Sequence, residues 1–297
     1  MIDAAIVTAI RARLTSALGP PRERMCPIRV DGFAAGWVDS PRAARLAAFD
    51  DVFRVDPDAI RFLPQLADEP SRSRAVDRIV RTLAAENALT AWRDARYAVA
   101  PDFGLPPWFL LERAAARYFG VRTFAAHVNG VVDAGGPPRM WFARRSPAKS
   151  IDPGLLDNLV GGGIAAGATV AGTVMKESQE EAGIGADLAA TARRAGTVEI
   201  CRLQPDGLQR ETLFVHDLTL PRDFWPAGQD GEAVEHILVD FNAAARLIAN
   251  TSGRDVVTVD ASLVALDCLL RHRAIAAASP ELAALEALRR SGPTQFD

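Results

Sequence analysis

The stretch GGIAAGATVAGTVMKESQEEAGI, residues 162–184, decides how the rest of the chain is interpreted. The apolar segment 155–164 leads into it and contains three consecutive glycines, which is typical of a strand that runs into a loop. Residues 169–182 then have helical periodicity, and Gly183 follows as a typical C-terminal stop. The stretch therefore predicts a strand, a glycine-rich loop and a helix in succession.

Three glutamates lie on one face of the predicted helix. Glu177 is three residues before Glu180 and four before Glu181, spacings that place Cβ atoms about 5 to 6 Å apart. Like charges repel at this distance, and the negative end of the helix dipole adds to the repulsion. One interpretation is a solvated acidic face. The other is a Mg²⁺ site, because carboxylate oxygens are ligands that Mg²⁺ prefers.

The order of glycines and charged residues in this stretch resembles the Nudix box, the loop–helix–loop signature G-x5-E-x7-R-E-U-x-E-E-x-G-U of the Nudix hydrolases. Three positions differ, since Ala168, Lys176 and Ser178 stand where the signature has Glu, Arg and an apolar residue. The missing first glutamate leaves the number of metal ions open, and Lys176 lacks the bidentate fork of an arginine. The matching positions are Gly162, Glu177, Glu180, Glu181, Gly183 and Ile184.

The hydrophobic periodicity changes near Gly120. Three segments before it have apolar residues at helical spacings, and two segments after it alternate as strands do. We therefore expect a mainly helical N-terminal domain at residues 1–120 and a second domain at 121–297. With the resemblance, the expected fold class is α/β, a Nudix α/β/α sandwich with a mixed sheet. The segments are 40–52, 73–91 and 108–119, then 121–132 and 140–146.

The resemblance implies a metal-dependent hydrolase that uses Mg²⁺, with Mn²⁺ as the alternative ion. Its first-choice general base is Glu177, which would take a proton from the attacking water. The segment DGEAVEHILV, residues 230–239, is similar to the Nudix strand whose leading acid adds a ligand, and it points to Glu232 with Glu235 as the nearest competitor. The implied ligands are the carbonyl of Gly161 and the carboxylates of Glu177, Glu180, Glu181 and Glu232.

The flanking sequence is similar to the thiamine-pyrophosphokinase-related Nudix group, which carries an N-terminal domain of the domain-of-unknown-function 4743 type. The similar segments are LLERAAARYFG at 110–120, HVNG at 127–130 and FARRSPAKSIDPGLLDNLVGGGIAAG at 142–167. This resemblance implies hydrolysis of a small-molecule diphosphate, best identified as thiamine diphosphate or its oxidised analogues, to a monophosphate and phosphate.

Six residues are candidates for contacts with such a substrate. Three are cations that suit a diphosphate, although strand alternation predicts that the two adjacent arginines point in opposite directions. His127 and Asn129 share one face of a predicted strand, and Arg113 lies on the preceding predicted helix. The structural alternatives are a satisfied structural histidine for His127 and a salt bridge to Glu112 or elsewhere for Arg113. The candidates are Arg144, Arg145, Lys149, His127, Asn129 and Arg113.

Composition excludes several classes of protein. The 34 basic and 37 acidic residues give a net charge of −3, which excludes bulk electrostatic binding of nucleic acid. No apolar stretch reaches the roughly 18 to 20 residues that span a bilayer. Three widely spaced cysteines fit free thiols in a reducing compartment, so the expected location is the cytoplasm. A homodimer through the N-terminal domain is a further expectation.

Alternative functions follow from the same residues. Within the hydrolases, the substrate is instead ADP-ribose or a nucleotide sugar. A non-catalytic diphosphate-binding module is suggested by Ala168 and Lys176. An activity like that of isopentenyl diphosphate isomerase needs a cysteine facing the site, and Cys201 is the one cysteine in the predicted sheet.

Overall fold

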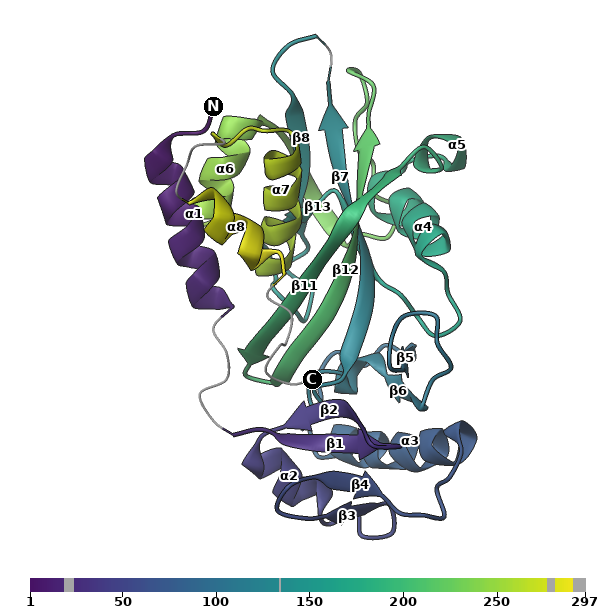
Figure 1. Ribbon diagram of the computed structural model, residues 1–297. Coiled ribbons are helices and arrows are strands. Elements are labelled where there is room, and N and C mark those ends of the chain that lie inside the picture. The colour runs from purple at the N-terminus through teal and green to yellow at the C-terminus, as the bar shows by residue number, and fades with distance from the viewer. Residues whose placement is uncertain (19–23, 134, 277–280, 291–297) are drawn as a thin grey trace.

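The computed structural model describes residues 1–18, 24–133, 135–276 and 281–290. Within them, a seven-stranded sheet forms the centre of the molecule, with the strand order β11-β12-β7-β8-β13, and with β10 paired to β7 and β9 to β8 (Figure 1). The β7–β12 pair is parallel and the others are antiparallel, so the sheet is mixed. Its strands are β7 (Arg122–Val132), β8 (Arg139–Arg145), β9 (Leu156–Asn158), β10 (Val160–Gly163), β11 (Arg193–Gln204), β12 (Gly207–Thr219) and β13 (Ala233–Asp240).

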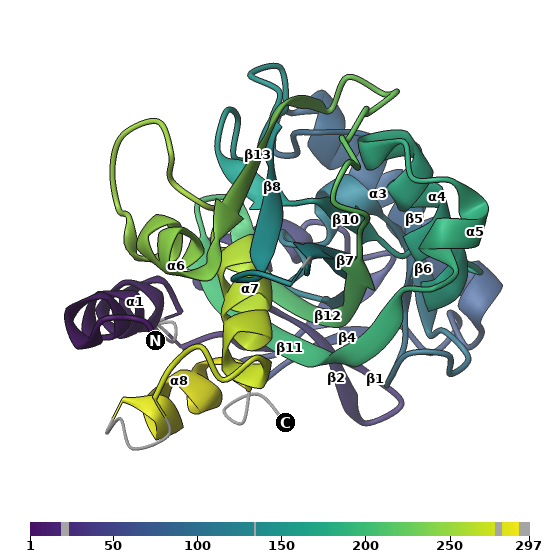
Figure 2. The same cartoon turned by 90° about the horizontal axis from the view of Figure 1, so that it is seen from above.

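Helices cover both faces of this sheet (Figure 2). Alternation along β7 sends Phe124, Ala126 and Val128 to the face covered by α4, and Ala125 and Val131 to the face covered by α7. The predicted α/β sandwich with a mixed sheet is therefore confirmed. The helices are α4 (Val170–Ala182) and α5 (Ala186–Ala189) on one face, and α6 (Phe241–Ala249), α7 (Val259–Arg271) and α8 (Leu282–Leu288) on the other.

The first helix, α1 (Ala4–Ala17), belongs to the second of these layers (Figure 1). Its apolar residues Val7, Ile10 and Leu14 are buried in the same cluster as Ile248 of α6 and Leu285 of α8. The helix begins at the side chain of Asp3, which accepts a hydrogen bond from a backbone N–H of the first turn. We propose that the chain divides into two domains near residue 120 and that α1 packs with the C-terminal one.

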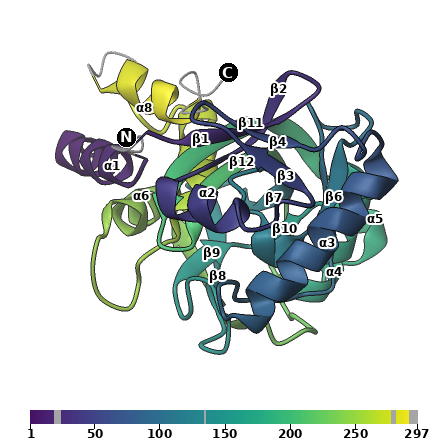
Figure 3. The same cartoon turned by 90° about the horizontal axis from the view of Figure 1, so that it is seen from below.

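The N-terminal region, residues 24–120, contains strands as well as helices and lies below the large sheet in Figure 1. Figure 3 shows the same region from below. A four-stranded sheet has the order β2-β1-β4-β3, and β5 and β6 form a separate hairpin. Helix α3 packs Val76, Ile79 and Leu83 into the core of this region. The elements are β1 (Cys26–Val30), β2 (Phe33–Val38), α2 (Ser40–Leu46), β3 (Phe53–Val55), β4 (Ile60–Phe62), α3 (Glu69–Ala85), β5 (Arg96–Val99) and β6 (Phe109–Glu112).

Sequence periodicity underestimated the strands of this region. The helix expected at 108–119 is wrong, because its first part is β6 and only Arg113–Ala115 form a short 3₁₀ turn. Phe109 and Leu111 point into the core with the alternation of a strand, which the alanine-rich segment after them obscured. The helices expected at 40–52 and 73–91 correspond to α2 and α3, with shifted ends.

Candidate active site

A cavity of about 200 Å³ lies between the N-terminal region and one end of the large sheet. One wall comes from residues 90–117, and the other from β7, β10, β12, α4 and the loops after β8 and β12. Most of the residues predicted from the sequence to form the site line this cavity, so we take it as the candidate active site. These residues are Arg113, His127, Arg145, Lys149, Gly161, Glu177, Glu181 and Glu232.

Three consecutive residues of β10 are glycines because other side chains lie directly against them. These side chains are His127, Glu177 and Tyr97. A Cβ added to Gly161 would come within 2.8 Å of the His127 ring. One added to Gly162 would lie 2.4 Å from Cγ of Glu177. Any side chain at these positions would displace the residues that line the cavity, so the glycine run is a requirement of the site.

Glu181 is held against the same strand. The backbone N–H of Gly161 donates a hydrogen bond of 2.7 Å to Oε2 of Glu181. Burial raises the pKa of Glu181 well above its usual range, and this hydrogen bond only partly opposes the rise. A cation bound beside the carboxylate would favour its charged form. The Gly161 carbonyl, which was expected to bind the metal, stays a prediction.

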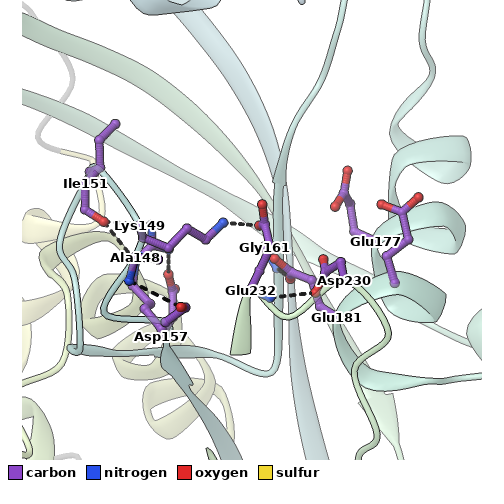
Figure 4. Close-up of polar contacts among 12 residues, drawn as sticks. Ala148, Lys149, Ile151, Asp157, Gly161, Glu177, Glu181, Asp230 and Glu232 are labelled. Carbon is purple, nitrogen blue, oxygen red and sulfur yellow. Dashed lines mark hydrogen bonds and ion pairs between the residues drawn. The ribbon is translucent and has the colours of Figure 1, made fainter. Parts of the chain in front are cut away.

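The carboxylates of Glu181, Asp230 and Glu232 form a cluster at the cavity. One oxygen of each lies within 4.8 Å of the others, close enough to share a cation (Figure 4). Hard oxygen donors of this kind fit Mg²⁺ or Mn²⁺. Sequence analysis did not single out Asp230, although it is the first acid of the segment in which Glu232 was identified.

The glutamates of α4 divide between the cavity and its rim. Glu177 lines the cavity, and its side chain is 17% exposed. Glu180 is 43% exposed and lies outside the lining. Nζ of Lys176 bridges them, at 3.0 Å from Glu177 Oε1 and 2.6 Å from Glu180 Oε2. The helix therefore presents Glu177 and Glu181 to the cavity, while Glu180 is held at the rim by the lysine.

Two of the predicted cations face the carboxylates. Nζ of Lys149 contacts Glu232 (Figure 4). Nη1 of Arg145 lies 2.6 Å from Oδ2 of Asp157. Although burial works in the other direction, Lys149 holds the pKa of Glu232 below its usual value. Both cations line the cavity, so they are placed to bind an anion there.

The expectation that Arg144 contacts substrate is wrong. Strand alternation turns its side chain away from the cavity, and only 6% of that side chain is exposed. Its guanidinium is bound by Glu235 and Asp255 and by the carbonyls of Gly154 and Arg254. The same contact occupies Glu235, which leaves Glu232 as the glutamate of this segment at the cavity.

His127 and Asn129 share one strand face, but only His127 lines the cavity. Nδ1 of His127 is 2.9 Å from Oδ1 of Asn158, which fixes the ring. Asn129 lies two residues further along β7, where α7 covers the sheet. Its amide donates to Asp217 at 3.0 Å and to the carbonyl of Val264 at 3.5 Å. The expectation that Asn129 contacts substrate is therefore wrong.

The N-terminal wall carries arginines that sequence analysis largely missed. Arg93 and Arg117 line the cavity together with Arg113. The alternative interpretation of Arg113, a salt bridge to Glu112 or elsewhere, is wrong, because Arg113 forms no ion pair among the described residues. Its guanidinium lies over the Tyr97 ring instead, 5.8 Å from the centroid. A lone arginine in a loop has no sequence signal that separates it from a surface residue.

A second group of acids lines the same cavity, formed by Asp152, Glu211 and Asp260. Burial raises the pKa of Glu211, and the nearby Asp260 raises it further. Gln209 donates a hydrogen bond of 3.0 Å to Glu211 and one of 2.9 Å to Asp260. These acids therefore suit a ligand group that is positively charged or donates hydrogen bonds.

Residues 8–123 match the family model "Domain of unknown function (DUF4743)", and residues 122–258 match the "NUDIX domain" model. Nudix hydrolase 24, chloroplastic, of Arabidopsis thaliana is 36% identical over 256 residues, which cover 86% of this chain and 69% of that protein. The chain belongs to the Nudix hydrolase family. Nudix hydrolase 20, chloroplastic, of the same plant is 34% identical over 83% of this chain and 67% of its own length.

This Nudix hydrolase is thus a diphosphate hydrolase of a family that generally uses divalent metal ions. A crystal structure from Deinococcus radiodurans has a TM-score of 0.43 and 22% identity, covering 57% of this chain and 96% of that one.

No helix among the described residues is long and apolar enough to cross a membrane. The cytoplasmic location and the homodimer stay predictions. Cys201 packs with Met25 and Leu208 in an apolar cluster and does not line the cavity.

Proposed function

We propose that this Nudix hydrolase cleaves thiamine diphosphate, or its oxidised analogues, to the monophosphate and phosphate with Mg²⁺. The observation that carries the substrate class is the mixture of charges in the cavity lining. The lining combines carboxylates that suit a metal ion and cations that suit phosphates with a second group of acids, Asp152, Glu211 and Asp260. Thiamine diphosphate has matching groups, since it carries a diphosphate together with a cationic thiazolium and an aminopyrimidine.

Glu177, Glu181 and Glu232, with Asp230, are the residues that would hold the metal. Glu180 would join them by exchanging its contact with Lys176 for the ion. Their oxygens are hard donors, and one oxygen each of Glu181, Asp230 and Glu232 lies within 4.8 Å of the others. When bound, Mg²⁺ lowers the pKa of a water and neutralises charge that develops on the phosphoryl oxygens.

The remaining roles fall to residues of the same wall. We propose that Glu177 accepts the proton of the attacking water, whose oxygen bonds to phosphorus as the bridging P–O bond breaks. Lys149 and Arg145 bind the phosphate oxygens. They stabilise the negative charge that develops there as the bridging P–O bond breaks. His127, held by Asn158, donates to or accepts from the substrate next to Gly161.

The experiment is phosphate release with Mg²⁺ from thiamine diphosphate and oxothiamine diphosphate, beside nucleotide release from ADP-ribose and a nucleotide sugar. We expect the highest kcat/KM with the thiamine compounds. A preference for ADP-ribose or the nucleotide sugar would support the hydrolase activity. It would overturn both thiamine diphosphate as the substrate and the assignment to the thiamine-related subgroup. Binding of all four without hydrolysis would favour a non-catalytic module.

The position of Ala168 argues against the non-catalytic module. This residue replaces the first glutamate of the signature, yet it precedes the N-cap Thr169 and does not line the cavity. The substitution therefore removes none of the carboxylates of Glu177, Glu181 and Glu232 that line the cavity.

A further inference from the structure

We infer that the N-terminal region is a wall of the active site that recognises the substrate's diphosphate through Arg93 and Arg113. These two guanidinium groups would bind the phosphate oxygens from the side opposite Glu177 and Glu181. The inference rests on the proposed hydrolysis of a diphosphate, but not on thiamine as the rest of the substrate.

Arg93 reaches from the N-terminal region to the metal-site loop. It lies between α3 and β5, and its Nη1 is 4.0 Å from Oε1 of Glu232. The distance is at the limit of an ion pair, and the arginine side chain is 43% exposed. Lys149 already contacts the other oxygen of Glu232, so Arg93 can move to a phosphate without leaving that carboxylate uncompensated.

Arg113 is a cation within the cavity whose charge is not neutralised by direct contact. Among the described residues it forms no ion pair, and its guanidinium lies over the ring of Tyr97. Tyr97 raises the pKa of Arg113 most, and the more distant carboxylates of Glu211 and Glu177 add to this. A guanidinium in this position has hydrogen-bond donors available for a ligand.

Tyr97 ties the position of Arg113 to the glycine strand. The tyrosine is buried in β5, and a Cβ added to Gly163 would come within 2.1 Å of its hydroxyl oxygen. The Arg113 guanidinium therefore rests on a ring that packs against the strand carrying Gly161 and Gly162. Tyr97 is a positioning residue, which places a cation across the cavity from Glu177 and Glu181.

Charge complementarity identifies the ligand class. A metal ion on the carboxylate wall neutralises one side of a diphosphate and leaves oxygens that face the N-terminal wall. Arginine suits these oxygens because its planar fork donates two parallel hydrogen bonds. A monophosphate presents fewer oxygens, so the two arginines would favour a diphosphate over its monophosphate product.

The test is calorimetric binding of methylenediphosphonate, a non-hydrolysable diphosphate, with Mg²⁺ to the full chain. We expect Arg113→Gln and Arg93→Gln each to raise Kd about 10- to 100-fold, because each removes charged hydrogen bonds to phosphate. Arg78→Gln is the matched control, since Arg78 is an exposed residue of the same region that pairs with Asp51 outside the cavity.

Two readouts separate recognition from loss of folding. Each variant's thermal unfolding is compared with that of the unchanged chain, and Arg113→Lys, which keeps the charge without the fork, should give an intermediate Kd. Unchanged Kd values in both glutamine variants, or no binding of the probe to the unchanged chain, would overturn the inference. If the arginine variants bind the probe more weakly but the unchanged chain does not hydrolyse thiamine diphosphate, the proposed substrate is wrong. The inference that Arg93 and Arg113 recognise a diphosphate is then still supported.

Discussion

The two walls of the cavity differ in the sign of their charge and in how visible they are in the sequence. The C-terminal wall presents Glu177, Glu181 and Glu232, whereas the N-terminal wall presents Arg93 and Arg113. The carboxylates come mostly from one helix, where their spacing forms a pattern. The arginines come from a loop and a 3₁₀ turn, where no spacing connects them.

The difference shows how one reaction can depend on two independent constraints. The carboxylate wall offers oxygen ligands to a metal ion, since Glu181, Asp230 and Glu232 each have an oxygen within 4.8 Å of the others. The arginine wall offers hydrogen-bond donors to an anion, since the Arg113 guanidinium lies over the Tyr97 ring and forms no ion pair among the described residues. A diphosphate bound with a divalent cation satisfies both walls at once.

Removing a carboxylate from the C-terminal wall should have the largest effect. We expect Glu181→Gln and Glu177→Gln to lower kcat by about 10²- to 10⁴-fold, since the first removes a proposed ligand and the second the proposed base. The measurement is phosphate release at saturating Mg²⁺ from the best substrate of the panel. Glu286→Gln on α8, an exposed residue far from the lining, is the control. A rate within a few-fold of the unchanged chain would remove these residues from the mechanism.

Mg²⁺ should stabilise the folded chain through the same wall. A ligand that binds only the folded state adds about 2.7 kcal/mol at a concentration 100 times its Kd. We therefore expect the melting temperature to rise with Mg²⁺, to fall back with EDTA, and to respond much less in Glu181→Gln. An equal rise in that variant would place the ion elsewhere.

Arg144 and Arg145 are neighbours on β8 and should give opposite results. Arg144→Gln should lower the free energy of unfolding by about 1 to 3 kcal/mol, because Glu235 and Asp255 lose their partner, with little change in KM. Arg145→Gln should raise KM with a smaller loss of stability. Denaturant unfolding and steady-state kinetics on both variants test this. A larger KM effect from Arg144→Gln would contradict the assignment of Arg145 to the substrate.

The smallest effect is expected from Asn129→Ala. Asn129 donates to Asp217 beneath α7, so its loss should cost about 0.5 to 1.5 kcal/mol of stability and leave KM unchanged. His127→Ala, two residues away on the same face, should alter KM. Urea unfolding and kinetics compare the two, and a KM change in Asn129→Ala would extend the site along β7.

Sequence analysis predicted the elements whose residues are close together in the chain. The glycine run, the α4 helix and its C-terminal Gly183 were predicted because capping and periodicity act over a few residues. The strand β6, Phe109–Glu112, was not, because its pairing with β5 depends on residues 10 to 16 positions away. Position in the sheet likewise decided that Arg145 faces the cavity and Arg144 does not.

The family, the α/β fold class and the carboxylates of α4 follow from the amino-acid sequence, since each rests on a local pattern. Which cations lie opposite those carboxylates depends on the tertiary fold. Arg93 and Arg113 reach the cavity because the N-terminal region packs against the end of the large sheet, with Tyr97 against Gly163. Such a contact depends on the shape of two surfaces, and no interval in the sequence encodes it.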